Sequence, residues 1–543
     1  MRSKIEKYLL QILIGLTLII MAVLYYFYHP SINLTDPHIY RWILYALVAG
    51  GAIPVIYCFL VDTSDTGFIT RVLKIIIPAV LVIVVGNFII RLVTSEVFFA
   101  KSYAKRITVE PVSFGNDTLP EVDFTKTPII DRESTETLGD KVMGEMPELV
   151  SQFEVSNSYT QISYKNSVYR VTPLEYAGFI KYLNNKKEGI PAYITVDSTN
   201  GKTKLVKLSE LGLKGMKYVP SAYFNYNLNR KLQLDYPTTI FGSPSFEIDE
   251  EGHPWYVCTT YKYFGIGNKK AVSGMILFDP ITGDSTKYKV GEFPDWVDRV
   301  FPESLVMEEI DDNGSLQSGF INSIFGQKNV MITSDGYNYL SKDGDIWIYS
   351  GITSANSDSS NLGFVLTNLR THETKKFSCS GANEYSAMAS AEGEVKNYGY
   401  NATFPLLINV GGNPVYLLSL KDDSGLVKQY AMVDAKDYQK VTTINGDSVK
   451  YLNQLKKNFL AARGYDDDTT VKTVTKTIEV ENFTILNVEG ATKVFITDTD
   501  KKKYKVEVST ANEDILAFLK KGQKLKIEYI EAEGVNVIRT IGS

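Results

Sequence analysis

Three apolar runs dominate the first hundred residues of the chain. They cover residues 8–28, 42–61 and 72–93, and each is close to the ~20 residues that a helix needs to cross the hydrocarbon core of a bilayer. Aromatic residues gather at the end of the first run and the start of the second, as at the two interfaces of a membrane. We therefore predict that residues 1–97 form a membrane region of three transmembrane helices.

Basic residues are distributed unevenly around these runs. Lys4 and Lys7 precede the first run and Arg71 begins the third, whereas the loop 29–40 contains neither Lys nor Arg. Cytoplasmic segments of membrane proteins are enriched in these residues. The N-terminus is therefore expected in the cytoplasm. After three crossings, residues 98–543 are expected to form a large extracytoplasmic domain of a multi-pass cell-membrane protein.

The apolar runs allow two interpretations. Pro54, Pro78 and the pair Gly50-Gly51 could interrupt the helices of a channel or transporter, or they could allow close helix packing. Spans that transport usually keep ionisable groups near the midplane, and Arg91 is the one clear charge deep in the last run. This pattern favours helices that anchor the chain in the lipid bilayer and that could also assemble it into a homo-oligomer.

Beyond residue 97, short runs of alternating apolar and polar residues indicate strands, separated by amphipathic helical stretches. Residues 98–133 carry mixed charge and several prolines, and are predicted to be a linker that can add a strand. A helix that precedes an antiparallel hairpin is typical of an α+β fold. We predict a first module at 134–225 and a second and third within 226–463. The helices are predicted from residue 134 onward, at 174–183 after Pro173, at 384–398 and at 448–463.

One hairpin pattern recurs along this part of the chain. An apolar run from Gly274 enters a turn at Asp279, in which Pro280 presets φ and Gly283 can take the left-handed conformation. In a second copy Gly201 follows its Asp at the same spacing. In a third Asn replaces the Asp and His372 replaces the glycine, and the fourth copy is looser. The predicted structural turn residues are Asp197, Gly201, Asp279, Pro280, Gly283, Asn368 and Asp434.

The phrase Asp279-Pro280-Ile281-Thr282-Gly283 resembles the turn of the PepSY family, in which a helix precedes strands that end in Asp-Pro/Ala-x-Thr-Gly. Asp197–Gly201 matches in part, and Asp434-Ala435 matches at the start. The resemblance spans about residues 134–445 as degenerate repeats. It implies extracytoplasmic protease-associated, inhibitory or scaffolding modules, with no catalytic residues to carry over. The whole chain also resembles three-span envelope proteins of Gram-positive bacteria that have no settled activity.

The last part of the chain follows a charged joint at residues 464–470. Three strand-like runs, a short helix at 512–519 and two more runs follow within residues 471–543. This order resembles the OB-fold, a small five-stranded barrel. Barrels that bind nucleic acid present exposed aromatic residues above basic ones. Phe495 and Tyr504 are the only candidates here, and their alternation with polar neighbours suits burial in the barrel as well. We therefore predict a structural or protein-binding barrel.

The composition narrows the function classes further. A net charge of -5 and a pI near 5.7 argue against a broad nucleic-acid-binding surface, so nucleic acid is an unlikely partner. Cys58 falls in an apolar run, which leaves Cys258 and Cys379 as the only pair that could form a disulfide bond in the soluble part. Both lie near predicted strands, where small buried thiols are expected.

We predict no catalytic residues, no cofactor and no metal site. His253 and His372 stand beside turns without the partners of a catalytic triad or a zinc site. Glu247 and Glu250 precede aromatic residues and could be the paired carboxylates of a glycosidase, or they could be the polar end of a strand. A binding surface is predicted at three aromatic residues, Trp255, Tyr256 and Trp296.

These patterns favour a non-enzymatic cell-envelope anchor or scaffold. Its extracytoplasmic domain would bind envelope proteins or a cell-wall polymer. The alternative is an envelope hydrolase that acts on glycans through paired carboxylates, for which Glu247 and Glu250 would have to meet in an aromatic-lined cleft.

Overall fold

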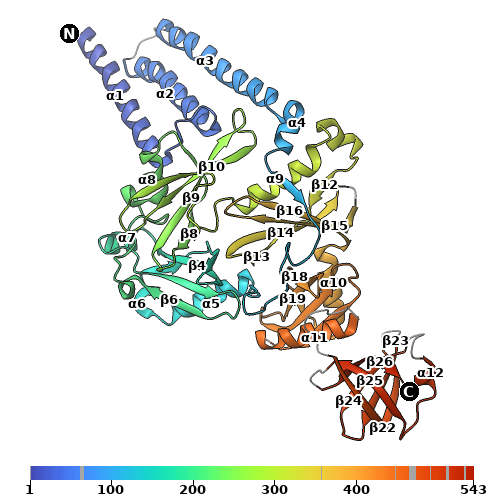
Figure 1. Ribbon diagram of the computed structural model, residues 1–543. Helices are drawn as coiled ribbons and strands as arrows, with labels where there is room; N and C mark the ends of the chain where they lie inside the picture. Colours follow the sequence, from blue (N-terminus) through green and yellow to red (C-terminus); the bar gives the residue numbers. More distant parts are fainter. Residues whose placement is uncertain are drawn as a thin grey trace.

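Three long helices, four β-sheets and a closed barrel follow one another along the chain in the computed structural model (Figure 1). The structure describes residues 2–61, 66–355, 357–446, 448–463, 473–488, 491–508, 513–530 and 534–542. The long helices are α1 (Arg2–Tyr28), α2 (Pro37–Val61) and α3 (Thr66–Val93), and each is long and apolar enough to cross a membrane. The three predicted apolar helices are therefore confirmed, and the sheet-rich remainder agrees with the predicted α+β class.

The four sheets share one strand plan. Within each, the first and second strands both pair with the third, the third pairs with the fourth and the fourth with the fifth, all antiparallel. The first sheet contains β2 (Phe153–Val155), β3 (Thr160–Tyr164), β4 (Ser167–Tyr176), β5 (Ala192–Asp197) and β6 (Thr203–Lys207). The second contains β7 (Ile240–Phe241), β8 (Ser245–Ile248), β9 (Pro254–Tyr263), β10 (Lys270–Phe278) and β11 (Ser285–Lys289). The third contains β12 (Met331–Thr333), β13 (Asn338–Lys342), β14 (Asp345–Ser354), β15 (Ser357–Asn368) and β16 (Thr374–Ala382). The fourth contains β17 (Asn401–Ala402), β18 (Leu406–Val410), β19 (Asn413–Lys421), β20 (Val427–Asp434) and β21 (Val441–Asn445).

A helix precedes each sheet, and we call each helix with its sheet a unit. The helices are α5 (Arg132–Gly144), α8 (Leu228–Asp235), α9 (Glu303–Leu316) and α10 (Glu384–Glu394); α11 (Leu452–Arg463) closes the fourth unit, and α6 (Pro147–Val150) and α7 (Phe179–Asn185) are short helices of the first. The range 226–463, for which two modules were expected, thus holds three units.

The additional unit was not recognised because its helix does not show a continuous apolar stripe. Glu303, Glu309 and Asp312 of α9 are buried together with Leu305 and Ile310. Charged residues at buried positions break the periodicity by which an amphipathic helix is recognised. Glu303 is paired with nearby Arg299, but Glu309 and Asp312 are paired with His372, Arg106 and Lys269, which are distant in sequence. The burial of these two charges therefore could not be anticipated from the local pattern.

The helix predicted at 174–183 starts later than expected. Strand β4 continues through Pro173 to Tyr176, and α7 begins at Phe179. Leu174 and Tyr176 are buried in the core of the first unit, and β2 pairs with this end of β4. Sheet packing therefore overrides the local preference of proline for a first helical turn.

The segment expected to be a linker, residues 98–133, is packed into the fold. It includes the end of α4 (Glu96–Ala104) and β1 (Val109–Pro111), which pairs in parallel with β16 and adds a sixth strand to the third sheet. Ile107, Leu119 and Phe124 of the same segment are buried. The segment therefore connects the helices to the sheets through hydrophobic contacts and not as a free tether.

The fourth strand of every unit ends in an equivalent turn. In each turn a side-chain oxygen of Asp or Asn accepts a hydrogen bond from the backbone N–H two residues later, over 2.7–2.9 Å; these residues are Asp197, Asp279, Asn368 and Asp434. Gly201 and Gly283 lie four residues after the Asp at φ of 74° and 85°, and each donates its N–H to the carbonyl oxygen of that Asp. Strands β10 and β11 pair antiparallel on either side of such a turn.

The C-terminal part of the chain is a closed barrel with strand order β22-β23-β24-β26-β25. Its elements are β22 (Thr473–Val488), β23 (Ala491–Asp498), β24 (Lys503–Glu507), α12 (Glu513–Ala517), β25 (Lys524–Ile530) and β26 (Asn536–Gly542). The first of the three strands predicted before the short helix is the long strand β22, which bulges between Val480 and Asn482 and so pairs with both β25 and β23. Tyr504 is buried in the barrel core, while the charged joint at 464–470 lies outside the described residues.

Candidate functional site: the base of the helices and a polar cleft

The second unit contacts one end of the group of three long helices directly. In the second unit, the turn between β9 and β10 receives both the α1–α2 loop and the end of α3. Gly267 N–H donates to the carbonyl oxygen of Thr35 (2.9 Å), and the Asn268 side chain donates to Arg91 O (2.9 Å) and Thr94 Oγ1 (2.8 Å). The N-terminus of α1 therefore lies at the far end of the helices from the sheets (Figure 1).

Arg230 of α8 fastens the end of α1 in a similar way. Its Nε donates to the carbonyl oxygen of Tyr26 over 2.8 Å, and its guanidinium lies 4.4 Å from the centre of the Tyr26 ring. Ile32 N–H also donates to Pro237 O over 2.7 Å. The ends of α1 and α3 and the loop between α1 and α2 are thus all hydrogen-bonded to the second unit.

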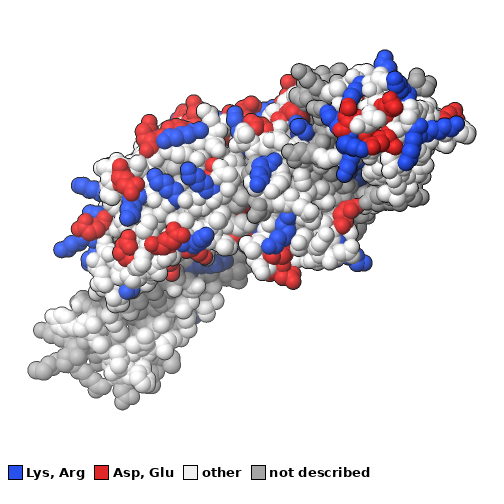
Figure 2. All heavy atoms as spheres, turned by 90° about the horizontal axis from the view of Figure 1, so that it is seen from below, with Lys and Arg blue, Asp and Glu red and all other residues white. Residues whose placement is uncertain are grey.

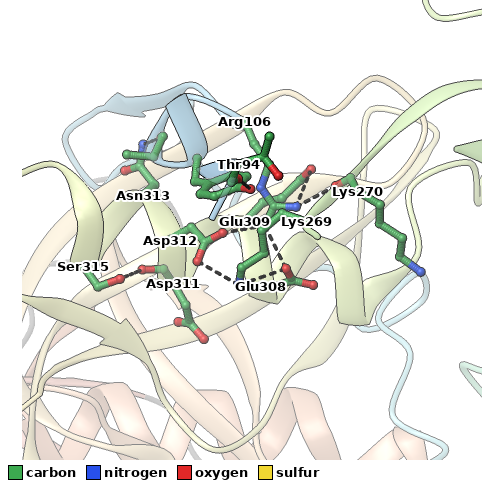
Figure 3. Close-up of polar contacts among 12 residues, drawn as sticks. Thr94, Arg106, Lys269, Lys270, Glu308, Glu309, Asp311, Asp312, Asn313 and Ser315 are labelled. Atoms are coloured by element: carbon green, nitrogen blue, oxygen red, sulfur yellow. Dashed lines mark hydrogen bonds and ion pairs between the residues drawn. The ribbon is translucent and has the colours of Figure 1, made fainter. Parts of the chain in front are cut away.

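A cluster of charged residues braces the same region (Figure 3). The side chain of Arg106, which follows α4, is fully buried and lies 2.7 Å from Asp312 and 3.1 Å from Glu308 of α9. Lys269 of the second unit lies 3.1 Å from the same Glu308 and 3.2 Å from the same Asp312. We call this cluster the helix-base junction, because it joins the segment leaving the helices to the second and third units.

Next to the junction, Glu309 of α9 is almost fully buried. One carboxylate oxygen lies 2.8 Å from Nε2 of His372, and the other lies 3.9 Å from Arg106. The imidazole ring of His372 stacks on Phe301, with ring centres 4.2 Å apart and planes 3° apart. His372 therefore stands in a pair with a carboxylate and is not a solvated turn residue.

The two carboxylates considered for a glycosidase do not share a cleft. Glu247 is fully buried, and its oxygens accept hydrogen bonds from the backbone N–H groups of Asp298 (2.9 Å) and Arg299 (3.1 Å). Burial raises the pKa of Glu247 to about 7. Glu250 is exposed on the turn after β8. Because Glu247 is closed off from solvent, a substrate cannot reach it, and the two carboxylates cannot act as a catalytic pair.

Asp298 belongs to the same buried acidic pair as Glu247. It is also almost fully buried and accepts a hydrogen bond from the backbone N–H of Ser163 in the first unit (2.6 Å). Burial, together with the charge of Glu247, raises the pKa of Asp298 well above its usual range. The pair therefore holds the first and second units together through backbone contacts, at a site closed to ligands.

The predicted aromatic surface is mostly internal. Strand β9 lies between two hydrophobic cores, so Tyr256 on one face is buried and Trp255 on the other packs against the second core. The rings of Trp255 and Trp296 lie 6.1 Å apart, and Trp255 Nε1 donates to Asp249 Oδ2 over 2.9 Å. A strand covered on both faces offers no exposed row of aromatic residues. The expected binding surface is therefore wrong for Tyr256, and the two tryptophans form a half-buried contact.

A cleft of about 640 Å³ opens where the first, third and fourth units meet. Its aromatic wall comes from Tyr337 and Tyr339 beside β13 and from Phe404 before β18; its basic groups include Arg170 of β4 and Lys421 of β19. These residues are far apart in the sequence, and the packing of three units brings them together. Sequence reasoning missed all of them, because each occupies an ordinary position on a strand or turn.

The two buried cations of the cleft are paired differently. Lys421 lies 2.8 Å from Asp131 and 3.2 Å from Glu133 of the α5 N-terminus. Arg170 is 8 % exposed and has neutral partners: Nε donates to Gln161 Oε1 (3.2 Å) and Nη1 donates to Thr135 Oγ1 (2.9 Å). Within the described part of the chain, no carboxylate forms an ion pair with Arg170.

Metal ligands, cysteines and surface charge were the remaining features of the described residues that could mark a site. They contain no group of three or more His, Cys, Asp or Glu side chains arranged to hold a metal ion. Cys58, Cys258 and Cys379 are buried and form no disulfide bond with one another, and burial raises the pKa of Cys258 and of Cys379. On the face seen in Figure 2, basic and acidic side chains are interspersed, without an extended area of one sign.

The chain matches no known protein family and no curated protein. Among solved structures it is similar to an exo-β-1,3-galactanase from Phanerochaete chrysosporium bound to β-1,3-galactotriose, with 11% sequence identity and a TM-score of 0.17. The similarity covers 62% of this chain and 76% of that one. A TM-score this low establishes no shared fold, so the galactanase carries no argument about activity.

Proposed function

We propose that this protein is a non-enzymatic scaffold of the cell envelope. The helices α1–α3 anchor it in the membrane, with the N-terminus in the cytoplasm, and the four units and the barrel bind envelope proteins or a cell-wall polymer outside. The observation that carries the proposal is the set of hydrogen bonds between the second unit and the ends of the long helices. A domain hydrogen-bonded to the ends of α1 and α3 and to the loop that leads into α2 is held at the membrane surface in a fixed orientation, as a scaffold requires.

Two structural features support the kinship of the repeated units with PepSY modules. Each unit has a helix before its sheet, and each ends its fourth strand in an Asp or Asn turn followed by a return strand. The order of the barrel strands, with β24 parallel to β26 and α12 between β24 and β25, supports the resemblance to the OB-fold. Both kinships fit binding modules better than catalytic ones.

The glycan-hydrolase alternative is weakened by the placement of its carboxylates. Glu247 is enclosed and held by backbone N–H groups, and Glu250 lies on an exposed turn. We therefore do not propose hydrolysis by this pair.

Sidedness and partner binding are tested separately. Protease added to intact protoplasts should remove the sheets and the barrel and leave a membrane fragment of about the first hundred residues. The same digestion after permeabilisation controls for protease access to the cytoplasmic side. Protection of the sheets in intact cells would reverse the orientation. Crosslinking followed by purification should recover an envelope protein or wall polymer, and recovery of neither would contradict the scaffold role.

A further inference from the structure

The cleft between the first, third and fourth units contains a cation without a matching anion. Arg170 is buried, and its two neutral partners leave the second terminal nitrogen, Nη2, without a hydrogen-bond partner among the described residues. Buried charges in proteins are normally paired, because removing an ion from water is costly. Burial lowers the pKa of the Arg170 guanidinium, because a charged group is less stable away from water than a neutral one. Arg170 lines the cleft, so an incoming group can reach it.

A second unpartnered donor lies beside Arg170. Gln161 is 6 % exposed and accepts from Arg170 through Oε1, while its Nε2 is buried without a hydrogen-bond partner. Buried amide donors are usually bonded, and leaving one unpaired is unfavourable. Of these two neighbouring donors, Arg170 is the one that lines the cleft, so an acceptor that enters the cleft would bond to Arg170.

The carboxylates around the cleft are already engaged. Asp131 accepts from Ser134 N–H at the start of α5 and pairs with Lys421. Asp422 lies 3.1 Å from Lys428 and accepts backbone hydrogen bonds within its own turn. Asp131 lies near enough to attract the charge of Arg170, but neither Asp131 nor Asp422 accepts a hydrogen bond from it. The Nη2 donor of Arg170 is therefore open to an acceptor that a ligand brings.

We propose that this cleft binds a small ligand with one carboxylate, which Arg170 holds in a charge-assisted hydrogen bond while the body of the ligand packs on Tyr337, Tyr339 and Phe404. Guanidinium matches the geometry of a carboxylate, and a volume of about 640 Å³ lies in the range of small-molecule sites. The exposed acidic residues Glu133 and Asp423 at the rim repel polyanions, which favours a monoanion over a phosphate polymer. This inference does not depend on the proposed anchoring or on its sidedness.

The test uses the purified full-length protein in detergent micelles. N-acetylphenylalanine is compared with its neutral amide, which has the same body without the charge, and inorganic phosphate and chloride test for general anion effects. At a concentration about ten times its Kd, the acid should raise the melting temperature by about 1–3 °C, and the amide should not. Equal effects of acid and amide, or no effect of the acid, would overturn the proposal. A larger effect of phosphate would overturn the choice of a carboxylate.

Two variants locate the site. Arg170→Met should weaken binding of the acid about 10- to 100-fold, the usual size for a hydrogen bond to a charged group, and should leave the ligand-free melting temperature unchanged or higher. Arg132→Gln is the matched control, because Arg132 lines the same cleft but is exposed and paired with Glu136; its binding should match wild type. Undiminished binding by Arg170→Met would refute the role of this residue. If that variant fails to fold, the comparison of acid with amide on the wild type still decides the proposal.

Discussion

Replacing Gly283 by alanine should destabilise the protein more than the same replacement at Gly201, although the two glycines close equivalent turns. Both have positive φ, 85° and 74°. A Cβ at Gly283 would lie 2.7 Å and 2.8 Å from two ring atoms of Tyr218, whereas a Cβ at Gly201 would approach Leu138 no closer than 3.4 Å. The pair therefore separates backbone strain from crowding.

The expected magnitudes follow from these two contributions. A left-handed conformation costs an L-residue about 1–2 kcal/mol, and this contribution is common to both variants. At Gly283 the ring of Tyr218 must also move, although it packs against Phe278 and Tyr226 at 5.9 Å and 5.2 Å between ring centres. The backbone N–H of Tyr218 also donates a hydrogen bond to the carbonyl oxygen of Pro280 over 2.9 Å, which limits how far the residue can shift. Overpacking of this kind costs about 1–3 kcal/mol. We expect losses of about 2–5 kcal/mol for Gly283→Ala and about 1–2 kcal/mol for Gly201→Ala.

Urea unfolding followed by tryptophan fluorescence measures the difference, since Trp255 lies on β9 of the same sheet and Trp296 packs against it. Thr286→Val on the exposed return strand β11 is the control and should change stability by less than about 0.5 kcal/mol. Equal losses for the two glycine variants would refute the crowding argument, and a loss no larger than the control would refute the turn geometry itself.

Three further outcomes are expected. Because folding raises the pKa of Glu247, this group stabilises the fold fully at a pH below its pKa in the unfolded chain, and the stabilisation is lost as the pH rises toward about 7. From pH 5 to pH 8 the free energy of unfolding should therefore fall by up to about 3 kcal/mol relative to that of Glu247→Gln. Parallel pH–stability curves for the two proteins would contradict this. Arg106→Met should cost about 2–4 kcal/mol, because the buried carboxylates of Asp312 and Glu309 each lose one of two basic partners and keep the other; exposed Lys101→Gln should be neutral when both variants are compared in thermal melts. Cys258, which is buried and free, should resist maleimide in the native protein and react in urea; rapid native labelling would contradict its burial.

Local chemistry made the turns and the long helices predictable. An Asp side chain that caps the second N–H after it, and a glycine that closes the turn, act within a few residues, so their pattern is visible in the sequence. The apolar runs were equally direct, because twenty apolar residues suffice to define a spanning helix. The barrel strands also followed from alternation, and the bulge lets the one strand β22 pair with both β23 and β25.

Long-range packing made the cleft and the third unit unpredictable. Arg170, Tyr339 and Lys421 belong to three different units, and nothing in their neighbouring residues indicates that they converge. The same holds for Asp312 of α9, whose buried charge is satisfied by Arg106 and Lys269, more than thirty residues away in sequence. A buried charge is intelligible once its partner is known, and that partner is a property of the tertiary structure.

The third turn shows how a repeated element acquired a second role. At the position where Gly201 and Gly283 close their turns, His372 takes φ of 68° despite its side chain. The strain of this conformation is offset by stacking on Phe301 and by the 2.8 Å pair with Glu309, which itself lies 3.9 Å from Arg106 of the helix-base junction. A glycine there would relax the turn but would leave the buried carboxylate of Glu309 with one fewer partner. The departure from the repeat pattern therefore follows from the position of this turn, which lies beside Glu309 and the helix-base junction.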